Sequence, residues 1–164
     1  MPASDPFVLR AHRAGDMDWI TRRHGEMYTA EQGWDSSFGV LVGEICADFE
    51  RNFDPALEHC WIAEMDGRQV ASVALARSGE DVVGKLRLLL VDASARGYGL
   101  GSRLVDECHA FARAAGYRKM RLWTTDQQKE ARHIYQGKGY KLIAEEPVYA
   151  FGQDMVNETW EMDL

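Results

Sequence analysis

The sequence predicts a mixed α/β fold in which one sheet of parallel and antiparallel strands carries helices on its faces. Segments with strand and helix periodicity follow one another in the order β-α-α-β-β-β-α-β-α-β-β. A hairpin signal at Asp66-Gly67 predicts antiparallel strands, and a glycine-rich turn at 96–102 joins a strand to a helix. No repeat, linker or low-complexity segment interrupts the 164 residues, so one domain spanning 1–164 is expected.

The first third of the chain predicts a short strand followed by two helices. Residues 7–10 alternate as a strand, and 16–30 are predicted to be helical with Asp16 as the cap. One face of that helix carries Ile20, His24, Met27 and Tyr28. Apolar residues then recur at three-and-four spacing from Phe38 to Phe49, which indicates an amphipathic helix ending near Asn52.

The middle of the chain predicts three strands in succession. Residues 61–64 and 69–77 flank the Asp66-Gly67 turn, and a second turn at 78–81 leads into a strand at 83–91. Helix 99–115 follows and stops at Gly116. A strand at 119–124, a helix at 126–136 closed by Gly137 and Gly139, and strands at 140–149 and 158–162 complete the order.

Composition excludes several classes of protein. The net charge of −7 disfavours nucleic acid as a partner, and no apolar run is long enough to cross a membrane. Cys46, Cys60 and Cys108 are widely separated, which is typical of a reducing compartment, so a cytoplasmic location is expected. Neither the cysteines nor the histidines have metal-ligand spacing, so no metal site is expected.

The glycine-rich turn is the strongest functional signal. Between a strand and a helix start, backbone N–H groups converge on an anion, and glycine removes the side chains that would block its approach. Two nucleotide motifs do not fit. Gly101 is followed by Ser102 without the lysine of a Walker loop, and Gly97, Gly99 and Gly101 lack the spacing of the dinucleotide fingerprint.

Two motifs in register do fit a known family. Arg96, Gly99 and Gly101 match Arg/Gln-x-x-Gly-x-Gly/Ala. Further along, Asn-x-x-Ala-x-x-x-Tyr-x-x-x-Gly-Phe/Tyr is matched except at its first position, in order by Gln128, Ala131, Tyr135, Gly139 and Tyr140. With the element order, these motifs resemble the GNAT superfamily of N-acetyltransferases. Residues 151–164, with Trp34-Asp35, also look like the acetyltransferase half of bacterial MarR–GNAT fusion proteins.

The resemblance implies acetyl-CoA as co-substrate, with the amides of the turn on its pyrophosphate and strand 83–91 beside its pantetheine arm. Arg96 and Arg103 would supply a local basic patch for the anionic cofactor, although the chain as a whole is acidic. The implied cofactor-binding residues are Leu89, Leu90, Val91, Arg96, Gly97, Tyr98, Gly99, Leu100, Gly101, Ser102, Gln128 and Tyr135. Gln128 replaces the family asparagine and is one methylene longer, which is a departure from the family pattern.

The resemblance also implies the catalytic groups. Tyr135 would protonate the departing thiolate, and the backbone N–H of Leu90 would contact the oxyanion. No single general base stands out, because the strand that carries a glutamate in some relatives has only Lys85 and Arg87 as polar residues. The remaining candidates are Glu26, Glu31, Glu44, Asp81 and His24.

The function expected from these residues is acetyl transfer to a primary amine by direct attack in a ternary complex, with the acceptor unidentified. Trp34, Phe38, Tyr149 and Phe151 would form either an aromatic wall of the acceptor pocket or ordinary core. The alternative is a regulatory module that binds acyl-CoA without catalysis. Family analogy also suggests a homodimer.

Overall fold

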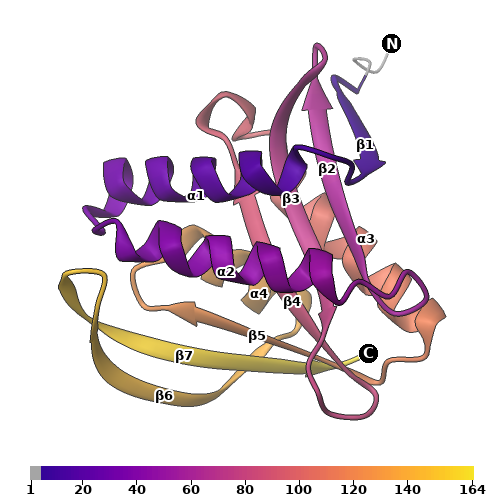
Figure 1. Cartoon of the computed structure of the whole chain (residues 1–164). Helices are drawn as coiled ribbons and strands as arrows, with labels where there is room; N and C mark the ends of the chain where they lie inside the picture. Colours follow the sequence, from indigo (N-terminus) through magenta and orange to yellow (C-terminus); the bar gives the residue numbers. More distant parts are fainter. Residues whose placement is uncertain (1–4) are drawn as a thin grey trace.

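The computed structural model describes residues 5–164 and confirms the predicted mixed α/β fold (Figure 1). One seven-stranded sheet has the order β1-β2-β3-β4-β5-β7-β6, in which only β4 and β5 are parallel. The strands are β1 (Phe7–Ala11), β2 (His59–Met65), β3 (Arg68–Arg77), β4 (Val83–Val91), β5 (Lys119–Thr125), β6 (Lys141–Ala150) and β7 (Gln153–Asp163). The helices are α1 (Asp16–Gln32), α2 (Ser37–Arg51), α3 (Leu100–Ala115) and α4 (Lys129–Lys138), with a 3-10 turn at Ala93–Ala95.

The helices divide between the two faces of the sheet and define two cores. Helices α1 and α2 cover one face, where Ile20, Phe38 and Val42 pack against strand residues such as Ile62. Helices α3 and α4 cover the other, where Leu104 lies in the same cluster as Tyr135 and strand residues. Within the described residues, no helix is both long and apolar enough to span a bilayer.

The element order agrees with the prediction, whereas several boundaries do not. Strand β7 begins at Gln153 instead of Glu158, because Phe151 and Gly152 form a tight hairpin turn with φ of 54° and 82°. Helix α4 begins at Lys129, three residues later than expected. Asp16 makes no cap bond to α1, whose N-cap is Gly15. The Asp16 carboxylate instead accepts hydrogen bonds from Arg10.

Strand β4 carries a bulge that changes which face its side chains occupy. Ala74 pairs with Arg87 and Ser72 pairs with Leu90, so Val73 lies opposite two residues of β4. Leu88 has φ of 59°, and the buried Ser72 hydroxyl donates a 2.7 Å hydrogen bond to its carbonyl. Before the bulge Leu86 packs toward α3, whereas Leu88 in the bulge and Leu90 after it pack toward α1 and α2.

Strands β4 and β5 separate after their first few residues. Their parallel pairing extends only from Val83 opposite Lys119 to Lys85 opposite Arg121. Beyond that point the two strands share no ladder, although β5 stays paired with β7 as far as Thr125. The carboxyl half of β4 therefore presents one backbone edge to an opening in the middle of the sheet.

Candidate active site

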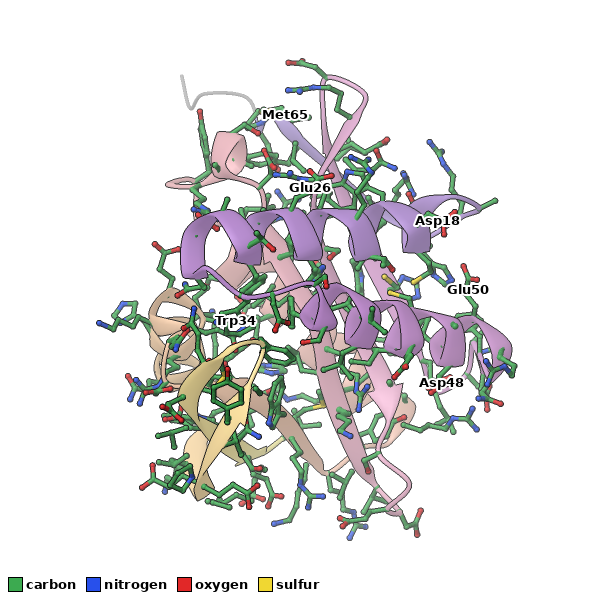
Figure 2. All side chains as sticks on the ribbon, turned by 60° about the vertical axis from the view of Figure 1, so that its left-hand side comes forward. Asp18, Glu26, Trp34, Asp48, Glu50 and Met65 are labelled. Carbon is green, nitrogen blue, oxygen red and sulfur yellow. The ribbon has the colours of Figure 1, made fainter. Side chains whose placement is uncertain are left out.

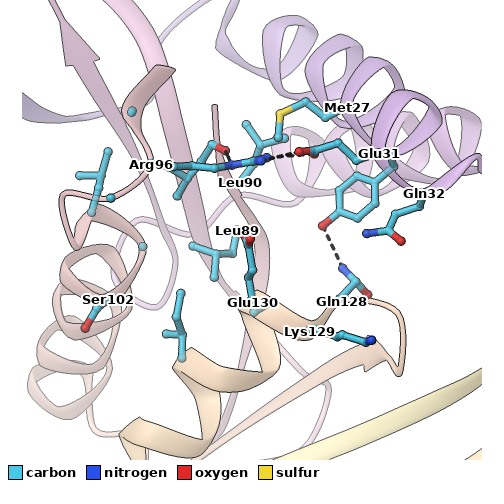
Figure 3. Close-up of a pocket in the computed structure, with 18 of the residues that line it drawn as sticks. Met27, Glu31, Gln32, Leu89, Leu90, Arg96, Ser102, Gln128, Lys129 and Glu130 are labelled. Carbon is cyan, nitrogen blue, oxygen red and sulfur yellow. Dashed lines mark hydrogen bonds and ion pairs between the residues drawn. The ribbon is translucent and has the colours of Figure 1, made fainter. Parts of the chain in front are cut away.

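A cavity of about 540 Å³, here called the glycine-loop cavity, lies where β4 meets α3 (Figure 3). Its walls come from the ends of α1 and β4, the turn before α3 and the first turns of α3 and α4. Nine of the residues implied for cofactor binding line it together with Gln128: Leu89, Leu90, Val91, Arg96, Gly97, Gly99, Leu100, Gly101 and Ser102. Tyr98 does not, because its exposed ring packs edge-on against Phe7 at 5.4 Å.

The start of α3 leaves backbone donors free at this cavity. Gly99 is the N-cap with φ of 74°, and no side chain caps the helix. The first amide to find a backbone partner is that of Arg103, which donates to the Gly99 carbonyl at 3.1 Å. A Cβ at Gly97 or Gly99 would meet nothing within 4 Å, so the loop borders open space. Free amides at a helix N-terminus beside an open cavity fit a pyrophosphate group.

Helix α3 approaches α4 closely through Gly101. A Cβ at this position would lie 3.0 Å from Ile134 Cδ1 and 3.5 Å from Val91 Cγ2. The third glycine of the turn therefore serves packing, because it lets the first turn of α3 lie against both β4 and α4. This contact holds the loop and the second motif together.

The two arginines expected to form a basic patch are both paired with carboxylates. Arg96 makes a bidentate ion pair with Glu31 of α1, and its Nε donates to the Val91 carbonyl at 3.2 Å. Arg103 pairs with Asp5 and does not line the cavity. Lys129, at the start of α4, lines the cavity as a further cation. The sequence reveals neither carboxylate partner, since both are distant along the chain.

The register of β4 corrects the position expected for the oxyanion contact. Asp92 N–H donates to the Val70 carbonyl at 2.7 Å, and Ser72 pairs with Leu90 in the same register. Because peptide groups alternate along a strand, the Leu90 N–H points toward β3. The N–H of Val91 points in the opposite direction, into the opening between β4 and β5. Leu90 is therefore the wrong residue for this backbone contact, although its side chain lines the cavity.

A second cavity of about 480 Å³, here called the α2 cavity, lies on the α2 side of β4. Its lining includes Phe38, Val42 and Ile45 of α2, and Lys85 and Arg87 of β4. Three residues line both cavities, namely Tyr28, Leu89 and Gln128. The two cavities therefore meet at one point, next to the β4 bulge.

Tyr135 lines the α2 cavity rather than the glycine-loop cavity. Its side chain is buried, with its ring edge-on to Tyr140 at 5.7 Å. Burial raises the pKa of Tyr135 well above that of a free phenol, with smaller contributions from Tyr28 and Cys108. The hydroxyl therefore stays protonated at neutral pH and can act as a proton donor.

Comparison with known proteins agrees with this arrangement. The model of the acetyltransferase (GNAT) domain family matches residues 56–142, which include β4, the glycine turn, α3 and α4. This stretch is more than half of the chain. The chain belongs to the GNAT acetyltransferase family.

The solved structures that resemble this GNAT chain cover nearly all of it. An acetyltransferase from Streptococcus agalactiae has a TM-score of 0.78 at 20% identity, with 98% of this chain and 99% of that chain covered. A GNAT acetyltransferase from Elizabethkingia anophelis, solved with acetyl-CoA bound, has a TM-score of 0.69 at 15% identity, with 98% and 100% covered. At this identity the likeness concerns the fold.

Sequence relatives are similar over part of their length. The N-acetylaspartate synthetase of Xenopus tropicalis is 33% identical over 83 residues, which are 51% of this chain and 31% of that protein. The chain spans about a third to a half of the length of the curated relatives it matches.

The point where the cavities meet depends on a hydrogen-bonded bridge that sequence reasoning missed. The Gln128 side-chain carbonyl accepts from Thr124 Oγ1 at 2.9 Å and from the Thr125 N–H at 3.0 Å. Its amide group donates to the Tyr28 hydroxyl at 2.9 Å (Figure 3). The polar atoms of Gln128 thus join the end of β5 to α1, and the Tyr28 hydroxyl keeps its own proton to donate. Burial raises the pKa of Tyr28.

The five candidate bases of this GNAT domain lie in different places. Glu26, labelled on α1 in Figure 2, is paired with Arg22 and Arg23 and lines neither cavity. Glu31 is paired with Arg96 in the glycine-loop cavity. Glu44 and Asp81 are exposed and line neither cavity. Only His24 lines the α2 cavity.

His24 is held in one orientation. Its Nδ1 lies 2.7 Å from the Ile20 carbonyl, so a neutral ring carries its proton there and leaves Nε2 as the acceptor. Burial lowers its pKa to about 4, so the ring is neutral at pH 7. No cluster of metal-capable side chains occurs among residues 5–164.

The four aromatic residues expected near the acceptor divide between core and surface. Trp34 is stacked on Phe151 at 4.8 Å and meets Phe38 edge-on at 4.7 Å, and its indole N–H donates to Gln127. Only Phe38 lines the α2 cavity, and Tyr149 is 72% exposed on β6. The cluster is therefore core that supports one wall of the α2 cavity.

Proposed function

We propose that this chain transfers the acetyl group of acetyl-CoA to a primary amine by direct attack in a ternary complex. The observation that carries the proposal is the pair of cavities that meet at Tyr28, Leu89 and Gln128. One cavity has the free amides of a phosphate site, and the other has the apolar walls of a small-molecule pocket. Two substrates can therefore be bound at once with their reacting ends at the shared wall.

The glycine-loop cavity is proposed for acetyl-CoA, whose thioester supplies the activated acyl group. The amides at the start of α3 would hold the pyrophosphate, with Arg96 and Lys129 as nearby cations. The peptide of Val91, which points into the opening beside β4, would replace Leu90 as the polar backbone contact. Gln128 would position Tyr28 at the shared wall through its hydrogen bond.

Tyr135 is proposed as the general acid. Amine attack on a thioester releases a thiolate, and a protonated phenol in the wall of the α2 cavity can return a proton to it. In the described part of the chain the Tyr135 hydroxyl has no hydrogen-bond partner, so its proton is available. Burial in the α2 cavity wall raises its pKa, so the hydroxyl is protonated before the thiolate forms.

Tyr135→Phe tests this role. We expect kcat to fall about a hundredfold or more, the contribution typical of a general acid, while calorimetry shows unchanged acetyl-CoA binding. Tyr149→Phe is the matched control, because its hydroxyl is on the exposed edge strand and outside both cavities. Full turnover in Tyr135→Phe would refute the acid role. Acetyl-CoA binding without thiol release over a broad amine panel would support the non-catalytic module instead.

The cellular setting is also a proposal. All three cysteines are buried as free thiols, which supports a reducing, cytoplasmic location. Strand β6 forms an edge of the sheet and is exposed along most of its length, which supports a homodimer through that edge. Trp34-Asp35 and residues 151–164 support the proposal that the chain is similar to the acetyltransferase half of MarR–GNAT fusion proteins. Sedimentation measurements would test the dimer.

A further inference from the structure

We propose that the α2 cavity selects an acceptor amine that also carries a carboxylate, as in a free amino acid, and that Lys85 and Arg87 bind this carboxylate. The inference rests on the proposed acetyl transfer and adds the chemical class of its acceptor.

The α2 cavity is lined by cations and by no acid. Lys85, Arg87 and Arg121 contribute to its wall, and no aspartate or glutamate does so among residues 5–164. The chain as a whole has a net charge of −7, so the cavity has the opposite sign to the protein. A site for a polyamine or another polycation would have carboxylates in these places.

Two of the three cations have no partner. Arg121 pairs with Glu80 and with Glu161, both at about 3 Å, and is neutralised. Neither Lys85 nor Arg87 makes an ion pair or a side-chain hydrogen bond within the described residues. The field of Asp48 reaches Arg87, but Asp48 is itself paired with Arg51 at 2.9 Å on the exposed face of α2 (Figure 2).

Both side chains are half-buried, which makes their lack of a partner costly. Burial lowers the pKa of Lys85, and the neighbouring charges of Arg87 and Arg121 lower it further. Burial also lowers the pKa of Arg87. Half-buried cations of like sign repel each other and are stabilised by an anion between them. A carboxylate is such an anion, and the planar guanidinium binds it through two parallel hydrogen bonds.

The rest of the cavity fits the remainder of an amino acid. Phe38, Val42 and Ile45 form an apolar wall opposite β4, suited to an aliphatic or aromatic side chain. Lys85 and Arg87 lie on β4 just before the bulge, and Leu89 in the bulge lines both cavities. An amino acid whose carboxylate binds Lys85 and Arg87 therefore has its remaining atoms between these two cations and the point where the cavities meet.

The same charges favour the reactive form of the amine. A nearby cation lowers the pKa of an ammonium group because it disfavours the second positive charge. An α-amino group held beside Lys85 and Arg87 loses its proton more readily, and His24 Nε2 is an acceptor in the same cavity. The absence of a carboxylate from this wall is therefore consistent with amine attack.

Matched acceptors test the proposal. Thiol release from acetyl-CoA is measured with L-phenylalanine and L-methionine, each against its carboxamide, and with spermidine. We expect kcat/KM to favour each amino acid over its amide by about tenfold or more, the value of a charged hydrogen bond. The amide has the less basic amine, so the comparison is biased against the proposal. A higher kcat/KM for the amides or for spermidine than for the amino acids would overturn the proposal.

Variants identify the residues responsible. Lys85→Gln with Arg87→Gln is expected to lower kcat/KM for the amino acids about tenfold or more, with little change for the amides and with acetyl-CoA binding intact. Arg118→Gln is the control, because it removes one exposed cation outside both cavities. A preference for the carboxylate that survives in the double variant would overturn the assignment.

A binding measurement separates this proposal from acetyl transfer itself. If no amine releases thiol although acetyl-CoA binds, catalysis is refuted, and the affinity of the CoA-loaded protein for N-acetyl-L-phenylalanine and for its amide decides the acceptor class. Tighter binding of the carboxylate, lost in the double variant, supports the proposal. Equal binding of the two compounds refutes it.

Discussion

Replacement of Glu31 by glutamine is predicted to tighten CoA binding. Glu31 holds the Arg96 guanidinium by two contacts at the mouth of the glycine-loop cavity, where an anionic ligand would have to compete with it. The pairing lowers the pKa of Glu31, chiefly through the Arg96 hydrogen bond, so the carboxylate is charged at pH 7. Glutamine removes that charge and leaves Arg96 anchored to the Val91 carbonyl through Nε.

The size of the effect follows from the exposure of the pair. The Arg96 and Glu31 side chains are 33% and 41% exposed, so water screens their attraction. An exposed ion pair is worth about 0–1 kcal/mol. Release of Arg96 can therefore strengthen CoA binding by up to about fivefold. The gain should shrink at high salt, because screening weakens every interaction of this kind.

Calorimetric titration of CoA into both proteins at low and at high salt measures this gain. Glu26→Gln is the matched control, because Glu26 is also a glutamate of α1 in ion pairs with arginines but lies outside both cavities. It makes the same change in net charge and should leave CoA affinity unchanged. If Glu31→Gln binds CoA no more tightly than the wild type, Glu31 does not compete for Arg96. An equal gain in Glu26→Gln would show that only net charge matters.

Two further predictions concern stability. Ser72→Ala removes the buried 2.7 Å hydrogen bond to the Leu88 carbonyl. The free energy of unfolding measured in urea should fall by about 1–3 kcal/mol. A change near zero would show that the bulge is stable without this hydrogen bond. Burial lowers the pKa values of His24 and His109 to about 4, so below pH 6.5 the unfolded chain binds more protons. Stability should therefore fall from pH 6.5 to pH 4 by about 1.4 kcal/mol per pH unit for each histidine. His12, His59 and several carboxylates also have lowered pKa values, so His24→Phe should reduce the slope of the unfolding free energy against pH by about 1.4 kcal/mol per pH unit without abolishing it. An unchanged slope would contradict the shift.

Local patterns predicted the fold well because its elements carry clear periodicity. Strand β4 has the predicted bounds, and α3 begins one residue later than expected. Strand β7 was the main error, since its amino-terminal half lacks an apolar run and owes its pairing to the turn at Phe151-Gly152. That turn places β7 beside β6 as soon as the chain reverses.

The position of the candidate site was predictable where the motif residues form the backbone of a turn. The glycine turn lines the expected cavity, because positive φ and a helix start can be inferred from adjacent residues. Three features could not be inferred. Glu31 meets Arg96 across 65 residues, Tyr28 meets Gln128 across 100, and the direction of the Leu90 peptide depends on a bulge without a glycine.

If the two cavities bind acetyl-CoA and the amine as proposed, the bulge in β4 separates the residues that recognise each of them. Side chains at 85 and 87 reach the α2 cavity, whereas the backbone at 89–91 borders the other cavity, and one extra residue between them offsets the two halves. On that proposal, exchange of Lys85 and Arg87 would change the amine that is accepted, while the backbone at 89–91 would keep its register. The extra residue in β4 would thus allow the side chains at 85 and 87 to vary between proteins of this fold without moving the backbone at 89–91.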